Sequence, residues 1–151
     1  MRVYLTGIGR SGTTYFRQIL SYLSSKGEIN FPYHKHHGLL SEINSDDIIF
    51  TPCRDLRDVI VSRWRIILSE EFKYNEVEER IMTKEEIDEE LKPTSVLNSQ
   101  LRDIVCNINN YGEQVKLVNY HQFINNPKYI LDCVSFCTGK MIDSSLYLKE
   151  L

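Results

Sequence analysis

The first fourteen residues constrain the fold most strongly, because an apolar run leads into a glycine-rich turn and then into a helical pattern. Residues 2–7 predict a β-strand and residues 13–26 predict an amphipathic helix. Between them, Gly7, Gly9 and Gly12 let the backbone turn tightly without a Cβ clash. The first N–H groups of a helix lack intrahelical partners and carry the positive end of its dipole. The sequence therefore predicts a turn that binds a phosphate-like or sulfate-like anion.

Two nucleotide-binding turns share part of this pattern. Gly7 and Gly12 have the glycine spacing of a Walker loop, but Thr13 stands where that loop requires lysine, and Arg10 is the nearest cation. The three glycines also match the G-x-G-x-x-G of dinucleotide-binding proteins, with Glu28 at about the distance of the ribose-binding acid. That fold requires an apolar helix face behind the third glycine, whereas polar residues follow here. A P-loop kinase and an NAD-binding Rossmann protein are therefore alternative interpretations.

The segment GIGRSGTTYF resembles the 5′-phosphosulfate loop of the sulfotransferases, with one cation, a Ser-Gly-Thr-Thr run and an aromatic residue. In that family the loop binds 3′-phosphoadenosine 5′-phosphosulfate (PAPS) without a metal ion. The resemblance implies a catalytic role for Arg10, whose guanidinium would stabilise the leaving 3′,5′-bisphosphate by charge and hydrogen bonding. The residues that it implies in cofactor binding are Arg10, Ser11, Gly12, Thr13, Thr14 and Tyr15.

A second segment resembles the family's 3′-phosphate signature, in which an arginine ends a strand and a serine follows eight residues later. Residues 47–52 predict the strand and residues 55–70 the helix, so Arg54 and Ser62 match the two positions. A planar guanidinium grips two phosphate oxygens while a hydroxyl takes a third. The resemblance therefore assigns Arg54 and Ser62 to the 3′-phosphate.

A third match lies late in the chain, where a strand at 114–119 precedes a helix at 127–138. It is similar to the family's block of strand, tyrosine, loop, proline and helix. The usual Tyr-Glu-Asp is replaced by Tyr120, His121 and Gln122, so both acids of the family pattern are absent. The resemblance implies that Tyr120 packs against the adenine.

The general base is expected just before the 3′-phosphate strand, where the family usually has a Lys-x-His element. Lys35 and His37 match that element, after a short strand predicted at 28–31. An imidazole is suited to accepting the acceptor's proton near neutral pH, so His37 is the first candidate and His36 the second. Some sulfotransferases use a glutamate instead, which makes Glu42 the runner-up. A zinc site and histidines without a role are the competing interpretations, and no metal is expected.

Strands alternating with helices predict an α/β fold with ligands at the carboxyl ends of parallel strands. Further helices are expected at 84–91 and at about 95–110. With the resemblance, the expected architecture is a three-layer sandwich, P-loop nucleotide-kinase-like, with a small parallel sheet flanked by helices. Residues 1–151 would form a single sulfotransferase-like domain. It would be compact or truncated at the C-terminus, because the family's closing Arg-Lys-Gly loop is absent after residue 139.

The amino-acid composition limits the kinds of partner that the protein is expected to bind. The chain is 42% hydrophobic and 26% charged, without a signal-peptide core or a membrane-spanning run, which predicts a cytoplasmic protein that binds no membrane. The first 69 residues carry nine Lys and Arg against six acids, as a polyanionic cofactor requires, but the overall pI of 5.8 argues against nucleic acid. Residues 70–90 are acidic and predict a solvated helical surface. The four cysteines show no metal or redox spacing and predict buried free thiols.

These observations predict a sulfotransferase that moves the sulfuryl group from PAPS to a hydroxyl or amine by in-line displacement. The product would be 3′-phosphoadenosine 5′-phosphate (PAP), and the acceptor a small molecule or a carbohydrate. The acceptor's identity and the oligomeric state are open. A nucleotide-binding module without turnover is the third alternative.

Overall fold

The computed structural model describes residues 1–75 and 82–143, with side chains over 1–66 and 82–143. The strands are β1 (Val3–Thr6), β2 (Tyr33–His36), β3 (Ile48–Cys53) and β4 (Val115–Asn119). The helices are α1 (Thr13–Ser25), α2 (Leu56–Asn75), α3 (Lys84–Leu91), α4 (Val96–Tyr111), α5 (Tyr120–Asn125) and α6 (Pro127–Thr138).

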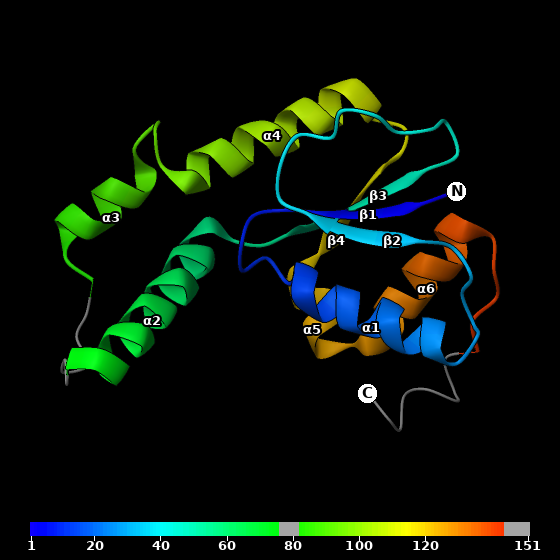
Figure 1. Ribbon diagram of the computed structural model, residues 1–151, viewed down its shortest axis with the longest axis horizontal. Coiled ribbons are helices and arrows are strands. Elements are labelled where there is room, and N and C mark those ends of the chain that lie inside the picture. Colours follow the sequence, from blue (N-terminus) through cyan, green and yellow to red (C-terminus); the bar gives the residue numbers. More distant parts are fainter. Residues whose placement is uncertain (76–81, 144–151) are drawn as a thin grey trace.

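The four strands form one parallel sheet in the order β2-β1-β3-β4. Figure 1 shows α4 on one side of this sheet and α1, α5 and α6 on the other. The α3 helix and much of α2 extend beyond the sheet at its left in that view. The predicted α/β class and the parallel sheet are therefore confirmed.

The core lies on both faces of the central strand β1, all of whose residues are buried. Val3 and Leu5 belong to the larger cluster, which includes Phe16 of α1 and residues of α6. Tyr4 belongs to the opposite cluster with Ile49 of β3. Because a parallel strand covered on both faces needs apolar residues in succession, the run that predicted β1 is nearly continuous rather than alternating.

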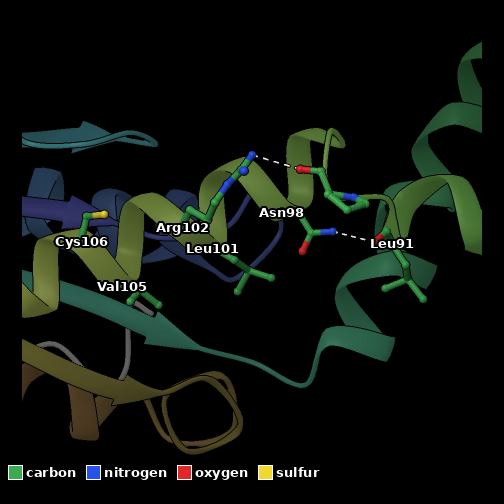
Figure 2. A pocket seen from close by; sticks show the side chains of 7 residues that line it. Leu91, Asn98, Leu101, Arg102, Val105 and Cys106 are labelled. Atoms are coloured by element: carbon green, nitrogen blue, oxygen red, sulfur yellow. Dashed lines mark hydrogen bonds between the residues drawn. The ribbon is translucent and has the colours of Figure 1, made fainter.

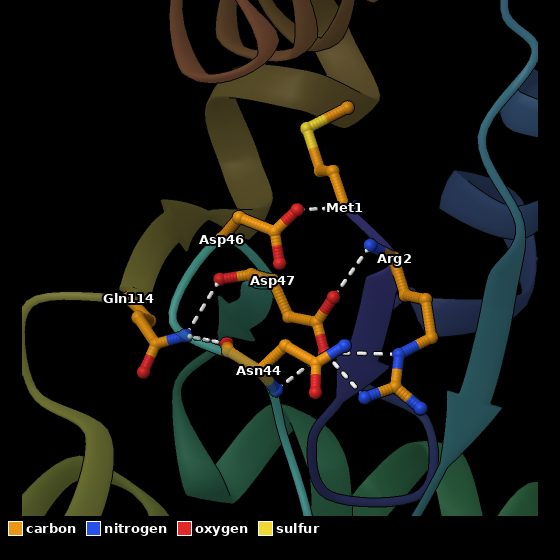
Figure 3. A network of polar contacts seen from close by, with 6 residues as sticks. All are labelled: Met1, Arg2, Asn44, Asp46, Asp47 and Gln114. Carbon is orange, nitrogen blue, oxygen red and sulfur yellow. Dashed lines mark hydrogen bonds and ion pairs between the residues drawn. The ribbon is translucent and has the colours of Figure 1, made fainter.

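A polar network holds the amino ends of three strands together (Figure 3). The backbone N–H, Nε and Nη2 of Arg2 donate to the carboxylate of buried Asp47 at 2.6, 2.9 and 2.7 Å. Nε2 of Gln114, just before β4, donates to the carbonyl oxygens of Asn44 and Asp47. Burial raises the pKa of Asp47, but hydrogen bonds from Arg2 and the Asn44 N–H more than offset this, and the net pKa is lowered. The network fixes the starts of β1, β3 and β4 relative to one another.

Two predicted details of the fold are wrong. The strand expected at 28–31 is absent, and β2 instead begins at Tyr33. Ile29 and Phe31 gave the apolar signal, and both are buried, but in the connection that leads to β2. As an edge strand with alternate residues exposed, β2 does not need an apolar run. The second error is α5, a helix of 6 residues that was expected to be a loop.

The other predicted helices and strands agree with the structure to within a few residues, apart from a longer α2. The α3 helix has no buried residue and starts with a capping box between Thr83 and Glu86, so the expected solvated surface is confirmed there. The remainder of that prediction, over 70–81, lies outside the residues whose side chains are described.

The expectation of buried thiols is wrong for two cysteines. All four are free, but Cys53 and Cys106 are exposed, while Cys133 and Cys137 are half-buried. Cys53 ends β3 at the edge of the sheet where the loops emerge, and Cys106 lies on the outer side of α4. Cys133 and Cys137 pack against the larger core cluster.

Candidate anion-binding site

The candidate site lies at the carboxyl edge of the sheet. The chain passes from β1 to its neighbour β2 in one direction along the sheet, and from β3 to its neighbour β4 in the opposite direction. The loops after β1 and β3 therefore separate, and open α/β sheets bind ligands at such a point. Residues 7–12 follow β1 and Arg54 follows β3, while His37 follows β2 and Tyr120 follows β4. All four strands thus deliver predicted site residues to one edge.

The loop after β1 depends on unusual backbone conformations. Gly12 has φ 95°, and a Cβ there would press on the ring of Phe123 and lie 2.9 Å from Cδ2 of Tyr120. Only glycine fits this position. Arg10 has φ 74° and is the non-glycine residue with positive φ in the described part of the chain. Such a conformation costs roughly 1–2 kcal/mol, so the surrounding contacts must hold Arg10 in place.

The amino end of α1 has no side-chain cap and no acidic residue in its first turn. By contrast, α3, α4 and α5 are capped by the side chains of Thr83, Ser95 and Asn119. An uncapped helix start leaves N–H groups and the positive end of the dipole available to an anion. This arrangement agrees with an anion-binding role for the loop.

The first two predicted segments meet directly. Nε of Arg10 donates to Oγ of Ser62 at 3.2 Å, and Nη1 of Arg54 donates to the carbonyl oxygen of Arg10 at 3.0 Å. Arg10 and Ser62 are 52 positions apart in the sequence, and Arg10 and Arg54 are 44 positions apart. Two guanidinium groups and a hydroxyl therefore gather beside the uncapped helix start.

Arg54 is held over an aromatic ring. Its guanidinium carbon lies 4.3 Å from the centroid of the Tyr120 ring, a cation–π distance. The side chain of Arg54 is only 17% exposed, and its Nε lies 3.9 Å from the carboxylate of Asp58. The same carboxylate lies 3.6 Å from Nε2 of His121. The segment after β4 is thus in contact with the 3′-phosphate candidate through Tyr120.

His37 is tied to the loop by its ring. Its Nδ1 lies 2.7 Å from the carbonyl oxygen of Gly7. Because a carbonyl can only accept, Nδ1 carries the proton in this bond, and in the neutral ring Nε2 keeps its lone pair. Lys35, which lies within β2 rather than after it, donates from Nζ to Oγ1 of Thr14 at 2.8 Å. Both residues of the Lys-x-His element therefore contact the loop or the start of α1.

The remaining predicted residues differ in what they offer to a ligand. Ser11 and Thr13 are only 1% and 2% exposed, so their side chains lie beneath the loop. Thr14 is exposed, and Tyr15 is half-buried with its ring stacked 6.1 Å from that of Phe123. The structure therefore brings the Thr14 hydroxyl to the surface and keeps those of Ser11 and Thr13 inside.

The two lesser candidates for the base lie differently from His37. Nε2 of His36 is 3.2 Å from the carbonyl oxygen of Leu39, in the segment that follows β2. Glu42 is exposed further along that segment. Of the three candidates, His37 has the contact with the loop after β1.

Sequence reasoning missed two amides on α4. Gln100 accepts a hydrogen bond from the Gly9 N–H, and buried Asn107 bonds to the backbone of Gly38 and Leu40 beside His37. Their position in the predicted helix could have indicated that they face the core, because both lie on the same face as Leu97, which is fully buried. Polar residues at core-facing positions of a helix usually have a partner that the sequence does not reveal.

A cavity of about 540 Å³ lies elsewhere, on the outer side of α4 (Figure 2). Its lining is mostly apolar and comes from the end of α3, the α3–α4 connection and α4. Asn98 and Arg102 donate hydrogen bonds to the carbonyl oxygens of Leu91 and Pro93 across it. These bonds hold the connection against α4, and the cavity offers no cluster of cations for an anion.

No protein family model matches this sequence, and no curated protein matches it. Among the described residues, no three His, Cys, Asp or Glu side chains form a group that could hold a metal ion. Within the same part of the chain, no helix combines the length and apolar character needed to cross a bilayer.

Proposed function

We propose that this protein is a PAPS-dependent sulfotransferase with a P-loop-like nucleotide-binding fold. The observation that carries the proposal is the meeting of the loop after β1 with the segment after β3, through the contacts of Arg10 with Ser62 and Arg54. A donor with a charged group at each end requires such a pair of anion sites. The sequence order of the three matched segments supports the same family.

The 5′-phosphosulfate would lie at the start of α1. The groups available there are the main-chain N–H groups of the first turn, the Arg10 guanidinium and the Thr14 hydroxyl. Lys35 donates a hydrogen bond to this hydroxyl. The uncapped helix start supports this assignment, because an anion would satisfy N–H groups that no side chain caps. The buried positions of Ser11 and Thr13 limit them to a structural role in the loop or to main-chain contacts.

The 3′-phosphate would lie beside Arg54 and Ser62. Binding there requires Ser62 to exchange its hydrogen bond with Arg10 for one with the phosphate. Tyr120 lies beside this site through its contact with Arg54, and its ring is the surface on which we propose that the adenine packs. Arg54 would then bind the 3′-phosphate while it keeps its contact with the Tyr120 ring.

In the reaction that we propose, the acceptor oxygen or nitrogen forms a bond to sulfur while the bond from sulfur to the 5′-phosphate oxygen breaks. Nε2 of His37 takes the acceptor's proton, because Nδ1 is committed to the Gly7 carbonyl oxygen. Arg10 and Lys35 offset the negative charge that develops on the departing 5′-phosphate. In this proposal side chains carry each of these steps, and no metal ligand set is required.

Calorimetric titration tests the proposed donor. We expect PAP to bind more tightly than adenosine 5′-phosphate, ATP with Mg²⁺ or NAD, because only PAP carries both the 5′- and the 3′-phosphate. A preference for ATP with Mg²⁺ would support a kinase, and a preference for NAD would support a dehydrogenase. Equal affinity for PAP and adenosine 5′-phosphate would contradict the 3′-phosphate assignment.

Turnover is measured separately with radiolabelled PAPS and a panel of alcohols, amines and carbohydrates. Transfer of label to any acceptor, lost in His37→Ala, supports the enzyme. Tight PAP binding without transfer to any acceptor would support the alternative of a nucleotide-binding module without turnover.

A further inference from the structure

The inward face of α4 carries amide side chains between apolar ones. Leu97 is fully buried against Ile8 of the loop after β1, and Ile104 packs against the same cluster. Gln100 and Asn107 lie on this face as well, seven residues apart and hence about two helical turns. Each amide bonds to the backbone of a different loop at the carboxyl edge of the sheet.

The bond made by Gln100 reaches the anion loop itself. Its Oε1 accepts from the N–H of Gly9 at 2.8 Å, across 91 positions of sequence. A Cβ built on Gly9 would lie 3.7 Å from both this oxygen and Nη1 of Arg63. Gly9 therefore passes between α2 and α4, with its N–H directed at α4.

Arg10 is held from both sides as a result. The N–H of Gly9, one residue before it, is bonded to Gln100, and its own carbonyl oxygen accepts from Arg54. Between these two contacts the backbone of Arg10 has φ 74°, and its side chain reaches Ser62. A left-handed arginine persists only where its neighbours impose it.

We infer that Gln100 is a positioning residue for the anion loop: it fixes the Gly9 peptide so that Arg10 is directed toward a bound sulfate-like or phosphate-like group. The inference rests on the proposed function only for the identity of the donor. Its physical content is that α4 sets the conformation of the loop, and through it the affinity for a tetrahedral anion.

The position of α4 does not depend on Gln100 alone. Leu97 is buried against Ile8, and Asn107 accepts from the N–H of Leu40 and donates to the carbonyl oxygen of Gly38. Tyr111 also donates to the carbonyl oxygen of Leu40. Gln100→Met, which keeps the length of the side chain, should therefore remove one hydrogen bond and leave the helix in place.

The test combines amide exchange with inorganic sulfate as the probe. In ligand-free Gln100→Met we expect faster hydrogen exchange of the Gly9 amide by NMR, and sulfate affinity weakened about three- to tenfold, the contribution of one neutral hydrogen bond. Gln100→Glu keeps an acceptor for the Gly9 N–H but adds a negative charge. It should retain Gly9 protection and lose sulfate affinity, with the loss decreasing as an inert salt is added.

Gln114→Met is the matched control, because it also removes hydrogen bonds from a glutamine side chain to the backbone, but at the opposite edge of the sheet. It should lower stability and leave sulfate affinity unchanged. Unchanged Gly9 exchange in Gln100→Met, or equal loss of sulfate affinity in Gln100→Met and Gln114→Met, would overturn the inference. If the protein does not bind PAP but its sulfate affinity depends on Gln100, the proposed donor is wrong. The role of Gln100 is then still supported.

Discussion

Nη1 of Arg54 donates a hydrogen bond to the carbonyl oxygen of Arg10, 3.0 Å away. The residue that follows β3 thus holds the backbone of the loop that follows β1. In the proposed complex the same guanidinium binds the 3′-phosphate. A change at Arg54 is therefore expected to affect both anion sites.

Arg54→Ala should weaken PAP binding by about tenfold to a hundredfold, the contribution of one charged hydrogen bond. The matched control is Arg57→Ala, three residues on, whose side chain is 89% exposed and paired with Asp55. That control should leave PAP affinity within about twofold, because an exposed pair contributes little. Calorimetry measures the PAP affinity of both variants. An equal loss of affinity in both would show that the effect comes from the overall charge of the protein.

His37→Ala should leave PAP affinity nearly unchanged and reduce the rate of sulfuryl transfer by about 10²–10⁴-fold, as expected for loss of a general base. The comparison variants are His36→Ala and Glu42→Gln, whose side chains lie in the same chain segment. Both should retain most of the rate. Single-turnover assays separate chemistry from binding, and a full rate in His37→Ala would transfer the role to another residue.

Gly12→Ala should destabilise the fold by about 3 kcal/mol, since a Cβ meets Phe123 and Tyr120 and the residue keeps a positive φ. Gly27→Ala has a similar φ of 73° but nothing within 4 Å of the added Cβ, so it should cost only about 1 kcal/mol. Urea unfolding of both variants isolates the packing contribution. Equal losses would show that the loop can move away from Phe123.

Stability should fall in acid partly through Asp47, whose pKa is lowered in the folded protein. Because this pKa is lowered, the ionised carboxylate contributes stability that is fully present above its ordinary pKa of 3.8. That stability is lost as the pH falls below this value. Asp47→Asn should cost about 2 kcal/mol at neutral pH and flatten this part of the pH profile. Asp46→Asn, whose side chain is 60% exposed, should change stability by less than about 0.5 kcal/mol. Urea titrations from pH 7 to pH 3 measure both.

The sequence predicted those parts of the fold in which local chemistry and tertiary structure agree. The apolar run before Gly7 and the glycines after it required a strand, a tight turn and a helix, and these are present. The run at 47–52 likewise became β3, with Arg54 directly after it. The nearness of Arg10 and Arg54 followed from one general rule, that parallel strands end at a common edge. Ser62 joins them from α2 through its hydrogen bond with Arg10.

The remaining features depend on contacts that the local sequence does not encode. Tyr33–His36 forms a strand because β1 offers a free edge, although its residues are polar and alternately exposed. The α5 helix starts at Tyr120, capped by Asn119, whose signal was hidden by the preceding strand. Gln100 and Asn107 find partners 91 and 67–69 positions away, at a distance where spacing carries no information.

The bare first turn of α1 has a thermodynamic consequence. Where α3, α4 and α5 receive a cap from their own threonine, serine or asparagine, α1 has glycine at this position, and its first N–H groups are left to solvent or to a bound anion. Any tetrahedral anion that binds there completes the secondary structure of the protein as well as its site. The melting temperature should consequently rise with the sulfate or phosphate content of the buffer, at constant ionic strength.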